Sequence, residues 1–367
     1  MYGQTKSYAG EMGLEMVLAI FGNAFLVLII VRGNAVSRRK LSPVQFLLLH
    51  TCVADLLFAF LAMGTGIVEL EILYKYDTAE WLCPVMKFLQ VFPLYASPFL
   101  LVAISADRFQ AICRPLAHYR ANGYQMPNLL ATIAWSLAFI CSIPQYYIWE
   151  KGLVHFFTTI LVTKVRNITC CQTVFSHRSY GATPLKVKKF WYIVSFNAVA
   201  WLLPSLITSF LYYRVCRAVW SSRVTDPLPE TAEKKNSTTN LKYLQTQCYV
   251  DGLRKSTLRR QISEFDKKRM QTVRLTLTIV VCNFLLYAPY CIGNVINALN
   301  EGLISRTLLT YCMILGNLNS CVNPWIYIFF NKGQVKRALC VSAELQSRSN
   351  NVCLNSTVLA FNTYFFY

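Results

Sequence analysis

NSCVNPWIYIFF, the segment from Asn319 to Phe330, decides the fold of this chain. It places amides, a proline and a tyrosine inside an otherwise apolar helical run. A polar group in hydrocarbon must find a partner within the protein, so such residues are costly and usually functional. We therefore expect buried polar partners for this segment elsewhere in the chain, with Asp55, Ser97 and Arg108 as the candidates.

The composition is that of a membrane protein. Of the 367 residues, 55% are hydrophobic and only 14% are charged, and the mean hydropathy is +0.38, outside the range of an ordinary soluble domain. The net charge of +19 would suit nucleic-acid binding. However, the Lys and Arg residues gather between apolar runs, as in loops that face the cytosol. We therefore expect a lipid bilayer as a partner and no nucleic acid.

Seven apolar runs are long enough to cross a bilayer, at about 20 residues per span. They cover residues 12–31, 44–68, 83–107, 128–148, 190–213, 271–298 and 306–330. The predicted fold is all-α, a seven-transmembrane helix bundle over residues 1–340 with a C-terminal tail over 341–367. The segment NKGQVKRALC suits a short amphipathic eighth helix on the membrane surface. The polar segment 221–263 is expected to be a flexible loop.

Basic residues in the connections predict the orientation. They follow the first run at Arg32 and Arg38, follow the third at Arg114, and fill the segment 214–274. By the positive-inside rule these connections are cytosolic, which places the N-terminus outside and the C-terminus inside a multi-pass plasma-membrane protein. The other loops would then be extracellular, which suits a glycosylation sequon at Asn167.

The 14 cysteines fall into two groups. Most lie inside apolar runs, where a cysteine acts as a small packing residue. Cys83, Cys170 and Cys171 lie where an oxidising compartment could reach them. Cys340, which ends the amphipathic segment, is a candidate for palmitoylation.

Polar residues in the third run share one helix face. Four of them are 3, 7 and 11 residues apart, each close to whole turns of the helix, namely Lys87, Gln90, Ser97 and Arg108. The four residues could share this face by chance. However, two of them are basic and lie in or beside hydrocarbon, which favours an inward-facing functional stripe. The stripe is roughly 32 Å long, about the thickness of one bilayer core.

Hard oxygen ligands gather at one depth of the predicted bundle. Asp55 places a carboxylate in the middle of the second run, which is costly unless it meets a cation or several donors. Other oxygen-bearing residues lie at a matching depth, namely Ser97, Asn319, Ser320 and Asn323. This set suits a small cation such as sodium, and we expect no other metal or cofactor.

Prolines interrupt four of the runs, namely Pro144, Pro204, Pro289 and Pro324. Each proline frees a backbone carbonyl and permits a bend in its helix. Bendable helices around a buried polar core predict a two-state switch.

With these features the sequence resembles a rhodopsin-like (class A) G protein-coupled receptor over residues 12–340. The marks of that family occur in order along the runs. They are Gly22-Asn23, Asp55, Cys83, Asp107-Arg108-Phe109, Arg114-Pro115-Leu116, Trp135, Pro204 with Tyr212, Pro289, and Asn323-Pro324-Trp325-Ile326-Tyr327. Each mark alone is a weak signal, whereas the ordered set is a strong one.

The resemblance implies a receptor without catalytic activity. It implies a disulfide from Cys83 to either Cys170 or Cys171. Asn283 and Tyr287 depart from the family, where a Phe and a switch Trp are usual. The resemblance further implies that a set of residues rearranges to admit a heterotrimeric G protein, namely Asp107, Arg108, Leu116, Tyr212, Tyr287, Pro289, Asn323, Pro324 and Tyr327.

The run KFLQV from Lys87 to Val91 looks like the KYLQV of vasopressin/oxytocin receptors, and SIPQ from Ser142 to Gln145 is also similar. Ala62 and Gly66 replace two glutamines of that group. This resemblance implies a neuropeptide ligand contacted by Lys87, Gln90, Gln145 and Asn294. Amide side chains both donate and accept hydrogen bonds, which suits a peptide backbone. We favour a divergent member of this group, such as an invertebrate nonapeptide receptor.

Three alternatives stay open. The ligand could be a gonadotropin-releasing or adipokinetic hormone-like peptide, the protein could bind peptide without signalling, or it could be a polytopic transporter. A transporter predicts inverted repeats or a continuous charged pathway, and the sequence shows neither. An intramembrane hydrolase would need paired histidines or carboxylates at depth, whereas only His50 of the four histidines lies near a run.

Overall fold

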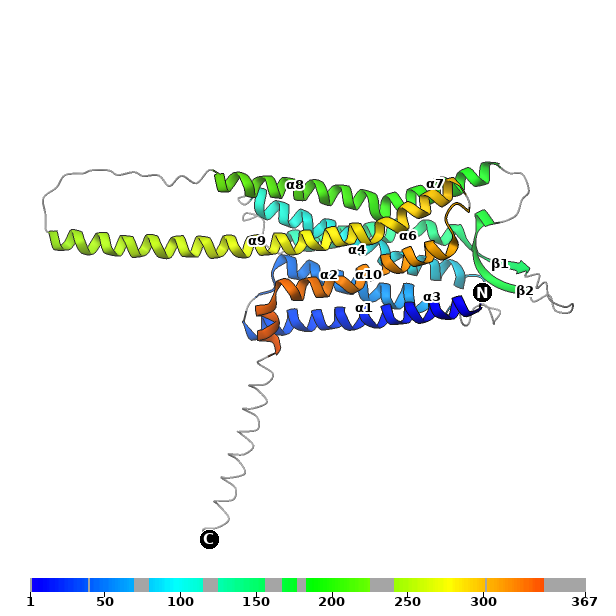
Figure 1. The fold of residues 1–367 in the computed structure, drawn as a ribbon, viewed down its shortest axis with the longest axis horizontal. Coiled ribbons are helices and arrows are strands. Elements are labelled where there is room, and N and C mark those ends of the chain that lie inside the picture. Colours follow the sequence, from blue (N-terminus) through cyan, green and yellow to red (C-terminus); the bar gives the residue numbers. More distant parts are fainter. Residues whose placement is uncertain are drawn as a thin grey trace, which may run out of the picture.

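The computed structural model describes residues 2–38, 40–68, 79–114, 125–155, 167–176, 183–224, 241–300 and 302–339. Within these ranges it confirms the predicted bundle of seven spanning helices. The helices lie side by side along a common long axis (Figure 1).

The helices cover the predicted runs, and the first, fifth and sixth spans extend well beyond them. Their bounds are α1 (Tyr2–Val36), α2 (Pro43–Phe58) with a π-helical turn (Ala59–Gly64) and α3 (Thr65–Val68), α4 (Leu82–Cys113), α6 (Gln125–Ile148), α7 (Thr183–Asn197) with a π-helical turn (Ala198–Leu202) and α8 (Leu203–Val224), α9 (Leu241–Leu299) and α10 (Arg306–Phe330). A short helix over residues 332–339 follows α10. Its Lys336 and Arg337 are exposed while Ala338 is buried, as an amphipathic helix requires.

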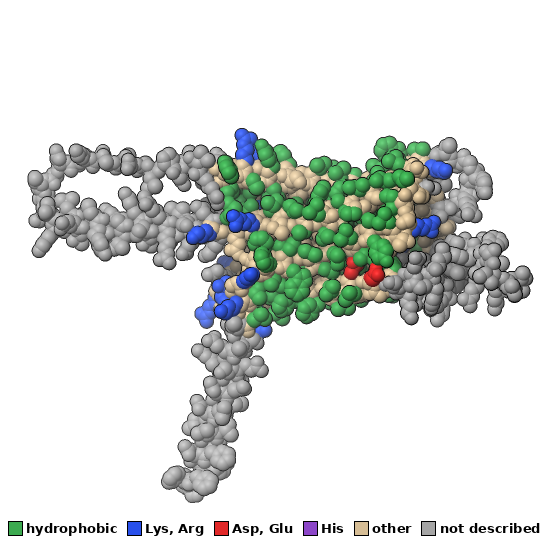
Figure 2. Space-filling view, in the orientation of Figure 1, with side chains coloured by type: hydrophobic (Ala, Val, Ile, Leu, Met, Phe, Trp, Pro, Cys, Tyr) green, Lys and Arg blue, Asp and Glu red, His purple; other side chains and the backbone are tan. Residues whose placement is uncertain are grey.

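Six of these helical stretches are long and apolar enough to cross a membrane by length and composition. α10 is not among them, because its asparagines and Pro324 lower its hydropathy. It nevertheless packs inside the bundle against α1 and α9. In Figure 2, hydrophobic side chains cover the middle of the visible face and Lys and Arg gather toward its two ends, as expected of a protein that spans a bilayer.

The two ends of the bundle differ. Strands β1 (Trp149–His155) and β2 (Asn167–Thr173) form an antiparallel hairpin in which Trp149 pairs with Thr173. Figure 1 places this hairpin at the same end as the N-terminus, and we call this the hairpin end. The opposite end carries Arg108, near the end of α4, and we call it the Arg108 end.

A disulfide ties the hairpin to the bundle. It joins Cys83, near the start of α4, to Cys171 of β2, with 5.6 Å between their Cα atoms. Of the two cysteines left open by the sequence, the structure therefore pairs Cys171. The bridge anchors the hairpin over the mouth of the helix bundle.

Local sequence explains where α2 begins. The Ser42 hydroxyl accepts a hydrogen bond from the Gln45 backbone N–H at 3.2 Å, and the Gln45 side chain accepts one from the Ser42 N–H at 3.1 Å. This reciprocal capping box satisfies two helix-end donors. Pro43 at the first helical position needs no donor there. The basic connection after α1 therefore ends sharply at a helix start.

The prediction of a flexible loop over residues 221–263 is wrong in part, because residues 241–263 belong to α9. No proline lies between Leu241 and Ala288, and the segment is rich in Leu, Lys, Arg and Gln, which favour helix. The segment also extends an apolar helix that is already formed, so it avoids the cost of a new nucleus. α8 likewise continues to Val224.

The four prolines singled out from the sequence all lie within helices, and α4 contains two more. Pro144, Pro289 and Pro324 lie inside helices, and Pro204 follows a π-helical turn. α4 contains Pro93 and Pro98 as well, which the sequence analysis did not single out. Four of the long helices therefore carry an interior proline, each of which removes a backbone hydrogen bond.

α1 and α10 approach closely around the family motifs of the sequence. A side-chain carbon added at Gly22 would lie 3.4 Å from Pro324 Cγ. Next to it, the fully buried Asn23 side chain donates 2.9 Å hydrogen bonds to the backbone oxygens of Ala19 and Ser320. Gly22 is therefore needed for close packing, and Asn23 joins the two helices.

We expect Gly22→Leu to destabilise the protein, because the larger side chain would push α1 away from Pro324. The cost of such overpacking is about 1–3 kcal/mol. Gly13→Leu on the same helix is the control, since nothing lies within 4 Å of its added carbon. Thermal unfolding of detergent-purified protein measures both, and equal Tm values for the two variants would contradict the prediction.

Candidate functional site

A cavity of about 460 Å³ opens at the hairpin end. Its apolar wall comes from several helices and includes Met12, Phe58, Leu94, Ile193, Phe196 and Met313. All four residues predicted to contact ligand line it, namely Lys87, Gln90, Gln145 and Asn294. The structure thus brings together side chains from α4, α6 and α9 that are far apart in the sequence.

Lys87 and Gln90 form a linked pair on one wall of the cavity. The Lys87 ammonium donates to Gln90 Oε1 at 3.1 Å and lies 5.0 Å from the centre of the Trp149 ring. Gln90 Nε2 donates in turn to Thr65 Oγ1 at 2.7 Å. The aromatic face and the amide oxygen both stabilise the positive charge at this wall.

Gln145 organises a second wall. Only 2% of its surface is exposed, and its Oε1 accepts hydrogen bonds from Trp149 Nε1 at 2.9 Å and from the Tyr192 hydroxyl at 2.8 Å. Trp149 therefore touches both the Lys87 wall and the Gln145 wall. The hairpin, α6 and α7 are joined through this one amide.

Sequence reasoning missed several residues of the cavity. Trp149 follows the fourth run, where nothing in the local pattern sets it apart from other aromatic residues at a membrane boundary. Thr65, which contacts Gln90, begins α3 directly after the π-helical turn Ala59–Gly64, where the side-chain period departs from that of an α-helix. The other polar lining residues that were not predicted from the sequence are Tyr8, Tyr192, Tyr290 and Asn317.

Tyr287 lies in the cavity lining and against α10. It is one of the two departures from the family pattern, and a side-chain carbon added at Gly316 would lie 3.2 Å from its ring. The other departure, Asn283, is buried in a small cavity with Pro98 and Pro204, and its Nδ2 has no partner among the described residues. That cavity has room for about one water molecule.

Asp55 is completely buried in the middle of the bundle. Its Oδ1 accepts from Ser97 Oγ and its Oδ2 accepts from Asn323 Nδ2, both at 3.1 Å. Asn319 and Ser320, the other oxygen-bearing residues of α10 singled out from the sequence, are also buried. Among the described residues, the side-chain oxygens of Asn319 and Asn323 have no hydrogen-bond partner. The polar segment of α10 therefore bonds directly to one of its three expected partners, Asp55, and is linked to a second, Ser97, only through that carboxylate.

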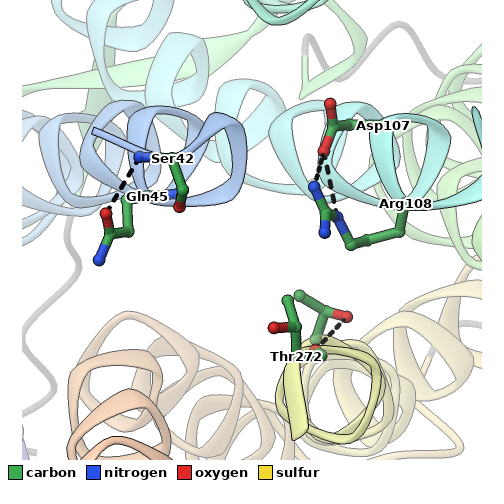
Figure 3. Close-up of polar contacts among 6 residues, drawn as sticks. Ser42, Gln45, Asp107, Arg108 and Thr272 are labelled. Carbon is green, nitrogen blue, oxygen red and sulfur yellow. Dashed lines mark hydrogen bonds and ion pairs between the residues drawn. The ribbon is translucent and has the colours of Figure 1, made fainter. Parts of the chain in front are cut away.

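The prediction that Arg108 is the third partner of this segment is wrong. Arg108 pairs with the adjacent Asp107 through Nη2 at 2.5 Å and Nε at 3.1 Å, and within the described ranges no hydrogen bond links it to residues 319–330. Figure 3 shows the guanidinium turned to Asp107, with Thr272 of α9 across from it. A neighbour on the same helix satisfies Arg108 without spanning the bundle.

Tyr327 has other partners. Its hydroxyl donates to Gln334 Oε1 at 2.9 Å and accepts from Gln45 Nε2 at 3.1 Å. Gln45 Oε1 accepts from Asn34 Nδ2 at 3.0 Å. We call Asn34, Gln45, Tyr327 and Gln334 the Tyr327 network; it joins α1, α2, α10 and the helix over 332–339.

The other predicted switch and modification sites divide into described and undescribed ones. Tyr212 is buried among apolar residues including Ile112 and Val273. Leu116 and Cys340 lie outside the described residues. Asn167 begins β2 at the hairpin end, and its side chain lies outside what the structure describes.

The sequence also matches known proteins. Residues 22–327 match the family described as "7 transmembrane receptor (rhodopsin family)". The chain is 47% identical over 331 residues to nematocin receptor 2 of Caenorhabditis elegans, covering 89% of this chain and 77% of that one. Identity to nematocin receptor 1 of the same worm is 42%, with 88% and 79% covered. The vasopressin V1b receptor of Mus musculus is 27% identical, with 91% and 74% covered.

We expect Gln145→Leu to lower stability more than Tyr192→Phe. The leucine leaves two donors, the Trp149 indole and the Tyr192 hydroxyl, without their acceptor, and each unsatisfied buried donor costs about 1–3 kcal/mol. Tyr192→Phe removes one hydrogen bond and leaves no donor behind. Thermal unfolding in detergent compares the two variants, and a smaller loss for Gln145→Leu would contradict the arrangement.

Proposed function

Since the chain belongs to the rhodopsin family of seven-transmembrane receptors, within its vasopressin/oxytocin group, we propose that it binds a nematocin-type neuropeptide and activates a heterotrimeric G protein. Members of this family are receptors and not enzymes, and they cross the membrane several times. The two nematocin receptors make the nematocin peptide the first ligand to test.

One observation carries the ligand proposal, namely that four residues singled out from the sequence converge on one cavity. The cavity volume of about 460 Å³ is in the usual range for ligand sites. Its polar groups include the amides of Gln90, Gln145 and Asn294, several tyrosine hydroxyls, and Lys87 as the charged group. Amides can pair with both the N–H and the C=O groups of a peptide backbone, which supports a peptide ligand.

The proposed orientation places the hairpin end outside the cell. The disulfide between Cys83 and Cys171 lies at this end, and disulfides persist in oxidising compartments such as the cell exterior. The Arg108 end would then face the cytosol and the G protein. The basic connections after α1 and α4 and the helix over 332–339 support this orientation by the positive-inside rule.

α4 offers a direct path for the signal. It carries Lys87 and Gln90 at the cavity, Ser97 at Asp55, and the Asp107–Arg108 pair at the far end. A ligand that displaces the cavity wall would favour bending of α4, which contains Pro93 and Pro98. The activated state would release Arg108 and Tyr327 from their present partners to open a binding surface for the G protein.

The oxygens around Asp55 fit a sodium ion. The set has the Asp55 carboxylate, the hydroxyls of Ser97 and Ser320, and the side-chain oxygens of Asn319 and Asn323, which have no partner among the described residues. Hard oxygen ligands of this kind are those that small hard cations prefer. When bound, the ion would neutralise the buried carboxylate.

Substitution of the Lys87 wall tests the peptide proposal. Lys87→Ala and Gln90→Ala should each reduce the potency of nematocin by about tenfold or more, because each removes a hydrogen bond that involves a charged group. Calcium and cAMP responses of cells with matched surface expression measure this. Lys336→Ala, an exposed lysine at the other end, is the control. Unchanged potency for both cavity variants would contradict the proposal.

The Tyr327 network predicts a second effect on signalling. Gln334→Leu removes the acceptor of the Tyr327 hydroxyl and should raise ligand-independent signalling about threefold to fivefold, as expected when one hydrogen bond of the resting state is lost. Lys336→Leu, exposed on the same short helix, should leave it unchanged. Reduced basal signalling for Gln334→Leu at equal surface expression would show that the network serves the active state instead.

A further inference from the structure

A second buried acid lies near the cavity. Glu15 lies within the first spanning helix, toward its hairpin end, yet only 4% of its surface is exposed. Its Oε1 has no hydrogen-bond partner among the described residues. An ionisable residue inside a membrane span is expensive and marks a functional site by default. Glu15 is not among the functional residues predicted from the sequence, and the proposed contacts of the ligand do not use it.

Asn317 connects Glu15 to the cavity. Its Nδ2 donates to Glu15 Oε2 at 3.3 Å, and Asn317 itself lines the cavity. Because the amide nitrogen points to the carboxylate, the amide oxygen points away from it. Within the described residues this Oδ1 accepts no hydrogen bond. Only 7% of the surface of Asn317 is exposed. Its Oδ1 is therefore an unpartnered hydrogen-bond acceptor at the cavity wall.

The surrounding contacts hold this acceptor in place. Cys321, one helical turn after Asn317, donates through Sγ to the Glu15 backbone oxygen at 3.4 Å, so α1 and α10 are joined at two successive turns. Tyr8, Met12 and Tyr290 line the same cavity as Asn317. The acceptor therefore lies on rigid elements, as a binding site requires.

The electrostatics of the cavity are unequal. Lys87, on α4, places a positive charge at one wall. Glu15, on α1, places an acid behind the α10 wall with Asn317 as its only hydrogen-bonded side chain among the described residues. A positively charged group of a ligand is repelled by the first wall and attracted to the second. Such a group would also supply the countercharge that a buried carboxylate needs.

We propose that Asn317 and Glu15 form a subsite for a protonated amine of the peptide ligand, with Asn317 Oδ1 as the contact and Glu15 as the positioning residue. This inference rests on the proposed function. The amine is either the N-terminal ammonium of the peptide or a basic side chain. Both present N–H donors with a positive charge, and charge-assisted hydrogen bonds are about twice as strong as neutral ones.

The test is a cycle between receptor and ligand changes. The probes are nematocin, its N-acetylated form, and a form in which any basic side chain is replaced by a neutral isostere. The receptors are the unaltered protein, Glu15→Gln and Asn317→Leu. Glu11→Gln, the same chemical change one turn earlier on α1, is the control. Potency is measured at matched surface expression, and the glutamine retains an acceptor for Asn317 while it loses the charge.

We expect neutralising the relevant amine to cost about tenfold on the unaltered receptor and on Glu11→Gln. Asn317→Leu removes the oxygen that contacts the amine, and Glu15→Gln removes the negative charge that attracts it. On both variants the neutralised and the charged peptide should therefore have potencies within about twofold of each other. The peptide form that shows this pattern identifies the amine. A purely structural role for Glu15 would weaken all peptide forms equally.

The outcomes separate the two proposals. If the unaltered receptor responds to nematocin but Glu15→Gln lowers the potency of charged and neutralised peptides by the same factor, or lowers neither, the subsite is contradicted and the proposed function stands. Insensitivity of the unaltered receptor to both neutralisations also contradicts the subsite. No response of the unaltered receptor to nematocin contradicts the proposed function and this inference with it.

Discussion

The buried carboxylate of Asp55 is the interaction on which the rest of the structure depends. A membrane span offers no water to solvate it, so donors must come from other helices. Ser97 of α4 and Asn323 of α10 supply them, each at 3.1 Å. Asn23 adds α1 to the same core through the Ser320 backbone oxygen. Four helices are thus joined by polar contacts at one depth, where apolar packing alone would leave their rotation about their axes less well defined.

Two functional regions lie on either side of this core. The cavity at the hairpin end is lined by Lys87 of α4 and Asn317 of α10, while the other end has Arg108 of α4 and Tyr327 of α10. The same two helices therefore pass through the cavity, the Asp55 core and the Arg108 end. Interior prolines weaken both helices at intermediate positions. Rigid segments with weak joints between them are the kind of element through which two distant sites can be coupled.

Much of the fold could be predicted from the sequence because hydrophobic runs and helix periodicity are local properties. The seven runs became helices, and the polar stripe of α4 faces inward at Lys87, Gln90 and Ser97. The sequence-based predictions were wrong in two places, one where a side chain had a choice of partners and one where a helix continued beyond its apolar run. Arg108 bonds to its neighbour Asp107, and residues 241–263 continue a helix that composition alone had made a loop.

The order of spans, the inward polar face of α4 and the receptor family follow from the chain without its coordinates, since each depends on residue type and spacing along one helix. The selection of Cys171, the capture of Tyr327 by Gln45 and Gln334, and the bond between Asn317 and Glu15 required the folded arrangement. A hydrogen bond or disulfide forms only when particular atoms meet within a few ångströms. For Glu15 and Asn317 those atoms come from positions 302 residues apart. The segment NSCVNPWIYIFF indicates by itself that its buried polar groups need hydrogen-bond partners, and only the packing of the helices determines which residues those partners are.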